Sequence, residues 1–412
     1  MIQINPLPKP RILSPEAFEE QGSAWYYLAD KRLPLVQVEI CFNYGTSYEE
    51  KALYNSFAWN LLFSGTKTKS QSEILEAFDA LGVHHQVELE GRNSGLSISC
   101  LQENLSEALK LTQDLLNETF IPEKEFNNYK NRRKQSFLIE SEKNMILAKR
   151  EFNAAFYGKA HPLGHYTTLA DFDAVELDNL RTHLRDKVFP AGLKIYVAGD
   201  LSEENKTALS QFVKAYPVQK KYKLKSFQYS PSEIHVEKEE ALQSAIKLGG
   251  FFPKAGEQDY FPLKVLVCLL GGYFGSRLNQ NLREQKGLTY GINAYLSSNV
   301  QCGVFGVVTE VNKDKRELAL ENILHEFEQL KQEKVDDKEL QKVKSYMKGQ
   351  LLQATDGVFS QIDLLKISKQ LGLHSTYYAD FIDAIDKTDE NHLLQLAHKY
   401  LNYNELVKVS VG

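Results

Sequence analysis

The amino-acid sequence predicts an α+β protein with two homologous lobes, each a mixed, mostly antiparallel sheet packed with helices. The chain has 412 residues, 42% hydrophobic and 25% charged, which is enough to bury more than one core. Its strand-like and helix-like segments recur in the same order about 210 positions later. Some neighbouring strands are too close in sequence for a crossover helix, which favours antiparallel pairing. Together these observations favour two copies of one α+β fold within the chain.

The repeat can be followed residue by residue. A shift of about 210 positions aligns Phe42 with Phe252, Leu53 with Leu263 and Gly65 with Gly275. Each half gives an extended segment (36–44; 245–252), a polar turn (45–50; 253–259) and an apolar helix (53–63; 261–270). Later in each half, a long helix is expected to begin, at residues 122–130 and 336–344. Each half then closes on an extended segment that ends in Gly, at residues 194–199 and 407–412. Their common order indicates duplication.

The remaining elements follow from local patterns. Ser70-x-x-Glu73 is a capping box that starts a helix, and 107–116 has the apolar spacing of a one-sided helix. Residues 83–90 and 95–101 are expected to form neighbouring strands. The segment 123–157 lacks Pro and Gly, so it predicts one long helix or two nearly continuous ones. A Lys- and Tyr-rich stretch without apolar periodicity then divides the chain into an N-terminal lobe (1–216), a linker (217–232) and a C-terminal lobe (233–412).

Charge and composition exclude several classes of function. The net charge of -5, without a dense basic block, argues against nucleic acid as the main partner, and Lys220–Lys225 is better explained as a solvated linker. No apolar run is long enough for a membrane helix, and residues 1–6 show no leader pattern, so we expect a cytoplasmic protein without a membrane partner. The four cysteines are widely spaced, which favours buried free thiols over a cysteine zinc site.

The most informative motif is Ser56-Phe57-Ala58-Trp59-Asn60, which is followed by Leu61-Leu62-Phe63-Ser64-Gly65-Thr66. It resembles the zinc helix of pitrilysin/insulinase-type peptidases, the inverzincins, which reads H-x-x-E-H. There, two His on one helix face hold zinc, and the Glu takes a proton from metal-bound water. Ser56 and Asn60 stand where the His would be, and Trp59 stands in place of the Glu. The family's third ligand, a Glu, falls near Phe137, so the resemblance implies a degenerate site without metal.

A second motif spans residues 271–290 and resembles the second-half signature of the same family, with Arg283 and Tyr290 as its pair. Gly287 would end the helix that carries Arg283, and Tyr290 would begin a half-buried strand. A guanidinium and a phenol that converge could bind a peptide carbonyl and the oxyanion formed from it. The alternative is that Arg283 caps the helix and Tyr290 packs at a sheet rim.

The resemblance covers nearly the whole chain and is closest to the bacterial two-domain branch, whose members form clamshell dimers. It implies a zinc-free subunit that supplies Arg283 and Tyr290 in trans, with zinc held by an H-x-x-E-H partner and a peptide as substrate. The chain is then inactive alone, and peptide hydrolysis requires the heterodimer. A purely structural or peptide-binding homologue is the main alternative, and a peptidase with an unfamiliar metal site is a weaker one. The isolated chain could also form a homodimer.

Other metal-like patterns are weaker. The stretch 325–329 imitates H-E-x-x-H but ends in Gln, within a charged helix. His161 and His165 flank a Pro-Leu-Gly turn, where a hydrogen-bonded loop role is favoured over chelation.

Overall fold

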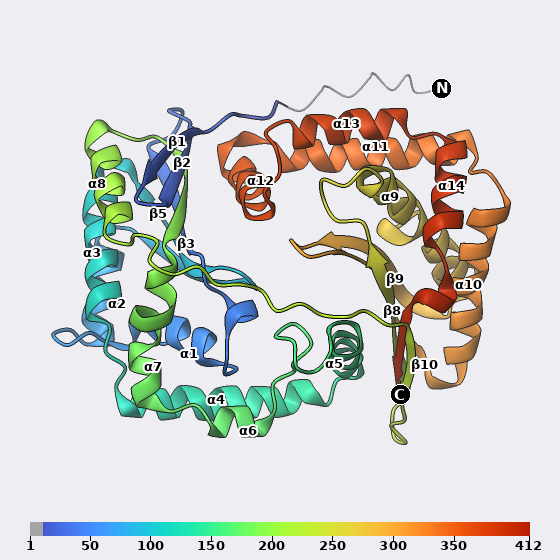
Figure 1. Ribbon diagram of the computed structural model, residues 1–412, viewed down its shortest axis with the longest axis horizontal. Coiled ribbons are helices and arrows are strands. Elements are labelled where there is room, and N and C mark those ends of the chain that lie inside the picture. Colours follow the sequence, from blue (N-terminus) through green and yellow to red (C-terminus); the bar gives the residue numbers. More distant parts are fainter. Residues whose placement is uncertain (1–10) are drawn as a thin grey trace.

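The computed structural model describes residues 11–412, and its two lobes stand side by side (Figure 1). Residues 1–10, and with them the prediction that no leader is present, lie outside the described part. Within residues 11–412, no helix is long and apolar enough to cross a membrane.

The first lobe is built on a six-stranded sheet in the order β1-β2-β6-β3-β5-β4. Only β2 and β6 pair in parallel; the other neighbours are antiparallel. The strands are β1 (Glu16–Glu20), β2 (Ser23–Ala29), β3 (Leu35–Phe42), β4 (His84–Leu89), β5 (Ser94–Leu101) and β6 (Leu193–Gly199). Most helices of this half lie on one side of the sheet: α1 (Tyr54–Asn60), α2 (Gln71–Ala80), α3 (Leu105–Glu118), α7 (Leu177–His183) and α8 (Glu203–Lys214). The predicted capping box at Ser70 and Glu73 is confirmed, since each side chain bonds the other's backbone N–H.

The second lobe repeats this plan with a five-stranded sheet in the order β7-β11-β8-β10-β9. The order matches β2-β6-β3-β5-β4 strand for strand, and β7 and β11 are again the parallel pair. The strands are β7 (Ser232–Val236), β8 (Gln243–Phe252), β9 (Thr289–Ser298), β10 (Gly303–Asn312) and β11 (Val407–Val411). The helices are α9 (Tyr260–Val267), α10 (Arg316–Gln332), α11 (Asp337–Ala354), α13 (Tyr377–Lys387) and α14 (Glu390–Tyr400). The predicted two-lobe, mostly antiparallel α+β fold is confirmed.

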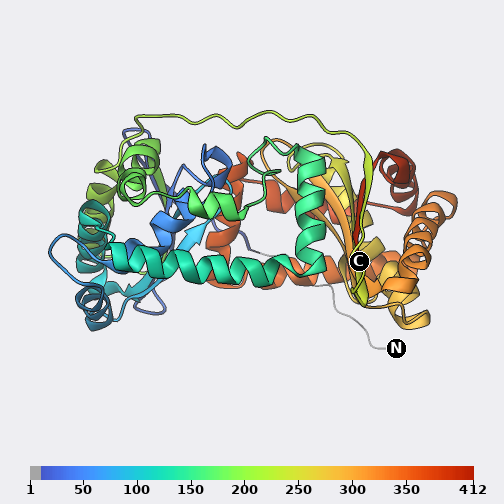
Figure 2. The same cartoon turned by 90° about the horizontal axis from the view of Figure 1, so that it is seen from below.

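The long helical segment of the first half breaks into two helices that run in different directions. α4 (Glu123–Ser141) is followed after two residues by α5 (Asn144–Tyr157), which turns steeply away from it (Figure 2). The expectation of two nearly continuous helices is confirmed, with only residues 142 and 143 between them, but the sequence did not predict their change of direction. The cause is tertiary: Phe152 of α5 packs against Gly249 of β8, where a Cβ would lie 2.7 Å from its ring. The helix thus leaves its own half to cover the other half's sheet.

The second half likewise contributes a helix to the other lobe: α12 (Gly357–Leu371) packs on the first sheet, against β2 and β6. Strand side chains alternate between faces, so Trp25 joins the helix-covered core while Tyr26 lies under α12 with Val358 and Ile362. The lobes are also joined by residues 217–231, which form neither helix nor strand and run across the top of Figure 2. Each sheet is therefore buried on its second face by a helix from the other half.

Candidate functional site

The helix that carries the degenerate zinc motif begins under strain. Leu53, just before α1, adopts φ 75°, and it is one of two non-Gly residues in the described chain with positive φ. The Leu53 side chain cannot cap the helix. Instead, the Glu49 carboxylate accepts a hydrogen bond from Asn55 N–H in the first turn. Burial raises the pKa of Glu49 to about 7, although that hydrogen bond opposes the change. Strain of about 1–3 kcal/mol at such a residue persists only where the surroundings enforce it.

The side chains at the three motif positions are committed to other contacts. Ser56 Oγ donates to Leu53 O at 3.0 Å, and Asn60 Nδ2 donates to Ser56 O at 2.7 Å, so both turn back on their own helix. Trp59 is fully buried, and its Nε1–H donates to Ser94 Oγ at 2.8 Å. Trp59 is thus a core residue of the first lobe, and no proton acceptor stands at the position of the catalytic Glu.

The third expected ligand position, Phe137, belongs to an aromatic cluster. Its ring lies 5.3 Å from that of Phe172, which in turn lies 6.2 Å from Phe57 of the motif. The Arg150 guanidinium covers Phe137 at 4.8 Å. Aromatic packing therefore joins α1 to α4, the two helices from which relatives would draw their metal ligands. Within residues 11–412, no three His, Cys, Asp or Glu side chains are grouped so that they could hold a metal ion. The donor set at the motif does not fit zinc.

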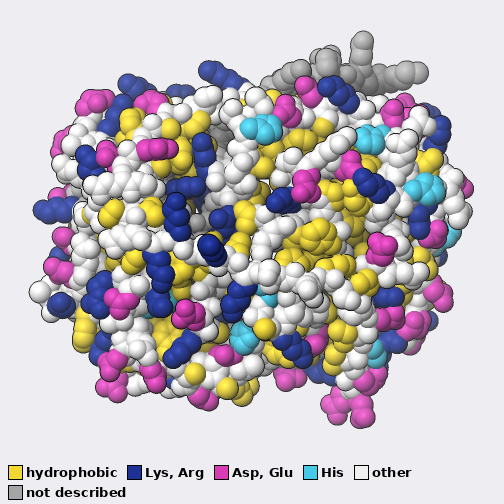
Figure 3. Space-filling model, viewed as in Figure 1, with side chains coloured by type: hydrophobic (Ala, Val, Ile, Leu, Met, Phe, Trp, Pro, Cys, Tyr) yellow, Lys and Arg dark blue, Asp and Glu magenta, His cyan; other side chains and the backbone are white. Residues whose placement is uncertain are grey.

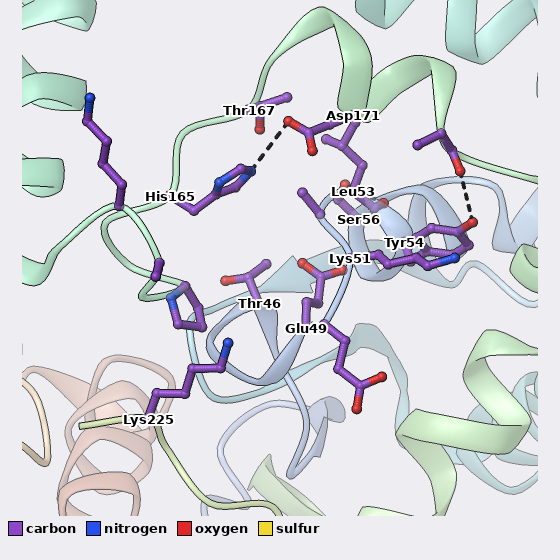
Figure 4. A pocket seen from close by; sticks show the side chains of 16 residues that line it. Thr46, Glu49, Lys51, Leu53, Tyr54, Ser56, His165, Thr167, Asp171 and Lys225 are labelled. Carbon is purple, nitrogen blue, oxygen red and sulfur yellow. Dashed lines mark hydrogen bonds and ion pairs between the residues drawn. The ribbon is translucent and has the colours of Figure 1, made fainter. Parts of the chain in front are cut away.

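A cavity of about 650 Å³ opens beside the start of α1 (Figure 4). Glu49, Leu53 and Ser56 line one side, and the loop after α5 with α6 (Leu169–Asp173) lines the other. Here His165 Nε2 lies 3.4 Å from Asp171 Oδ2, the contact dashed in Figure 4. The lining mixes acids and bases, so the cavity could bind polar groups of a peptide without doing metal chemistry.

His161, next to this cavity, has the loop role that the sequence favours. It is 4% exposed; Nδ1 accepts a hydrogen bond from Leu163 N–H, and Nε2 bonds Lys225 O at 3.0 Å. Because Nδ1 is the acceptor, the proton lies on Nε2. Burial lowers the pKa of His161, which keeps the ring neutral and fastens the linker to the loop.

The second predicted pair, Arg283 and Tyr290, is brought together, with a third partner that the sequence did not reveal. The Arg283 guanidinium carbon lies 5.1 Å from the ring centre of Tyr290 and 4.7 Å from that of Phe274. Tyr290 is 91% exposed and Phe274 is 62% exposed. Phe274 falls within the 271–290 motif, but an aromatic residue in a turn gives no local signal of such a stack. Gly287 makes the predicted stop with φ 59°.

The Arg283 pair lies apart from the cavity at α1. Neither Arg283 nor Tyr290 lines that cavity. The opposite end of β9, at Ser298, lines a hollow together with Ser47 of the first lobe. Tyr290 is eight residues back along the strand, about 27 Å away. Within one copy of the chain, the pair therefore lies outside the cavity beside the α1 motif.

Comparisons with known proteins identify the family. A model described as Insulinase (Peptidase family M16) matches residues 27–164, and one described as Peptidase M16 inactive domain matches residues 174–347. The chain is 28% identical to an uncharacterized zinc protease YmxG of Bacillus subtilis, over 78% of this chain and 79% of that protein. It is 23% identical to the non-peptidase homolog YmxG of Helicobacter pylori, over 92% and 89%.

Solved structures agree with this fold. The peptidase M16 inactive domain from Pseudomonas fluorescens superposes with a TM-score of 0.88 at 22% identity, over 97% of this chain and 98% of that one. A protease from Helicobacter pylori gives a TM-score of 0.83 at 16% identity, over 98% and 100%. The names of the relatives thus include both proteases and a non-peptidase. With both halves matched by models of one family, the chain belongs to the insulinase family of peptidases, family M16.

Proposed function

We propose that this chain is a non-catalytic subunit of a zinc peptidase, which binds peptide and supplies Arg283 and Tyr290 to the active site of a homologous H-x-x-E-H subunit. The observation that carries the proposal is the contrast between the two motifs. At the first, Trp59 is buried in the core and Ser56 and Asn60 bond their own helix. At the second, the pair stands together with Tyr290 open to solvent.

The chemistry offered by the pair is hydrogen-bond donation. The guanidinium carries five N–H donors and the phenol one O–H, and neither can accept a proton from water at neutral pH as a general base would. Because Tyr290 is exposed, a peptide held by a partner can reach its hydroxyl. The donors would steady the oxyanion of the tetrahedral intermediate, and loss of one such donor typically costs about 10²–10³ in rate. Zinc and the base belong to the partner in this scheme.

The test uses the complex of this chain with an H-x-x-E-H homologue. Arg283→Ala or Tyr290→Phe is expected to lower kcat about 10²–10³-fold while zinc content and complex formation stay unchanged. Glu284→Ala, an exposed neighbour on the same helical turn, is the matched control and should leave kcat unchanged. Unchanged turnover in both pair variants would remove the catalytic role.

One contact favours a second candidate, a structural or peptide-binding homologue without catalysis. Arg283 faces the rings of Phe274 and Tyr290. Such a cation–π contact can stabilise the surface of the lobe by itself, without any ligand. In that case Arg283→Ala destabilises the chain and leaves the turnover of any partner unaffected. The first experiment is to test whether an H-x-x-E-H homologue copurifies with this chain: copurification favours the catalytic subunit role, and its absence favours the structural one.

Two further expectations belong to this proposal. We place the heterodimer in the cytoplasm, a choice supported by the four cysteines, which are free and buried. We also keep the division of the chain into 1–216, 217–232 and 233–412, supported by the irregular stretch 217–231 between the sheets.

A further inference from the structure

We propose that the second lobe holds a binding site for a carboxylate carried on an apolar or aromatic group. The site is a cavity of about 540 Å³, within the range of small-molecule sites, about 300–1,000 Å³. It is open to solvent and lined by residues of α9, β9, α11, α12 and α13, and it is separate from the cavity beside α1.

The walls of this cavity are mainly apolar and aromatic, with Ser297, Ser298 and Gln350 as further polar lining. Aliphatic side chains contribute Val267, Leu296, Met347, Leu351 and Leu364. The aromatic lining consists of Tyr260, Tyr295, Tyr346, Tyr377, Tyr378 and Phe381. At the rim, Ile367 is 42% exposed and Tyr346 is 38% exposed, which leaves apolar surface open to a ligand. Figure 3 shows hydrophobic side chains gathered on this face of the second lobe, over β9 and α9.

Among the described residues, 11–412, the lining has a single charged side chain, Lys264 of α9, and no Asp or Glu. The ammonium group lies 5.6 Å from the ring centre of Tyr260 and 5.5 Å from that of Phe381. These rings are its close partners; within residues 11–412 it forms no ion pair with a carboxylate. Burial accordingly lowers the pKa of Lys264. A lone cation in apolar walls is costly, and a bound carboxylate would offset that cost.

The position of the cavity in the repeat supports a binding role. Cys268, which lines it, corresponds to Ala58 in the first-half motif under the shift of about 210 positions. Leu351 corresponds to Phe137, because the helices that carry them are offset by about 214 positions. The cavity therefore lies beside the second lobe's counterparts of the α1 motif and of the Phe137 position, although the counterparts of Ser56, Trp59 and Asn60 do not line it.

The ligand could be a free acid or the C-terminus of a peptide. A peptide could also add a strand to the sheet, because β9 is an edge strand and no strand in the described part of the chain pairs with its outer side. Both sources share the same chemistry, an apolar body with one carboxylate. The site is independent of Arg283 and Tyr290: neither lines it, and Tyr290 is about 17 Å along β9 from Tyr295.

The test is isothermal titration calorimetry on the full chain with two sets of probes. One set is the straight-chain acids from hexanoate to decanoate, with decanol and decylamine for comparison. The other is a hydrophobic hexapeptide with a free C-terminal carboxylate, compared with its amide. We expect affinity to rise about fourfold per added CH₂ and to fall at least tenfold when the carboxylate is replaced.

The variants separate the charge from the fold. Lys264→Met should weaken binding of the acids at least tenfold, whereas Lys264→Arg should retain it. Lys110→Met, the same change at an exposed lysine on α3, is the matched control and should have no effect. Ala354→Phe, which adds a ring to the cavity from α11 and keeps Lys264, should also abolish binding, and an unchanged circular dichroism spectrum of each variant excludes misfolding.

Binding of the free acid alone, of the peptide acid alone or of both would support the site and identify its source. Equal binding of acid, alcohol and amide would overturn the proposal, as would unchanged binding by Lys264→Met or no binding of any probe. Failure of the Arg283 and Tyr290 experiment would leave this outcome unaffected, because the two sites share no residue.

Discussion

Removal of Lys366 from α12 should loosen the contact between the lobes and lower the free energy of unfolding substantially. Its Nζ lies 2.7 Å from Glu39 Oε2 of β3, and 3.7 Å from Glu90 Oε1 and from Asp363 Oδ1. Lys366 is 9% exposed and Glu39 is 4% exposed, so both charges are desolvated. Lys366→Met keeps the aliphatic stem but leaves Glu39 buried without its cation.

The expected cost is about 3–5 kcal/mol, because breaking one partner of a buried pair leaves an uncompensated charge. This is a large share of a typical total of about 5–15 kcal/mol. Burial raises the pKa of Glu39 even beside the lysine. Loss of the lysine raises that pKa further, so the cost of the variant should shrink at acid pH as Glu39 takes up a proton.

The assay is urea unfolding followed by far-ultraviolet circular dichroism. Lys134→Met is the matched control: its ion pair with Asp173 is as short, at 2.6 Å, but the two side chains are 32% and 66% exposed. That variant should cost no more than about 1 kcal/mol. The double variant Glu39→Gln/Lys366→Met should recover most of the loss, since no charge is then stranded. A cost below about 1 kcal/mol for Lys366→Met would refute the assignment of a buried interlobe pair.

Three further predictions concern the first site and the packing between the lobes. Trp59→Glu should not install a catalytic base; it should destabilise the chain by about 3–5 kcal/mol by emptying a core site and burying a carboxylate, and a folded, stable variant would contradict this. Burial raises the pKa of Glu49 to about 7, so its protonated carboxyl contributes to the free energy of unfolding below about pH 4.5, and that contribution is lost as pH rises through about 7. Urea unfolding at a series of pH values should show this decline in the native chain and not in Glu49→Gln. Gly249→Ala should cost about 1–3 kcal/mol because its Cβ would lie 2.4 Å from a β10 carbonyl oxygen and 2.7 Å from the Phe152 ring of α5, whereas Gly291→Ala meets nothing within 4 Å; equal thermal stability of the two variants would disprove this close packing around β8.

Much of the fold was predictable because its signals are local. Strand and helix patterns depend on residues a few positions apart, and duplication repeats them at a fixed offset. The residues Ser56, Trp59 and Asn60 could be placed on one helix for the same reason. The pairing of Arg283 with Tyr290 was implied by the family resemblance, and the glycine stop between the helix and the strand that carry them is a local signal that allows it.

Contacts between distant segments were not predictable in this way. The sequence of 123–157 allowed a nearly continuous helix, and only the docking of α5 on the opposite sheet explains its change of direction. The strained Leu53 and the Phe274 stack likewise depend on neighbours that local patterns do not specify.

The sequence by itself determined the fold class, the repeat and the loss of metal-ligand side chains, because side-chain chemistry and hydrophobic period are properties of short stretches. Only the tertiary structure decided that the lobes exchange α5 and α12, that Trp59 is a core residue, and that Lys264 stands alone in an apolar cavity. These depend on which surfaces exclude water together, and burial is a property of the packed chain as a whole.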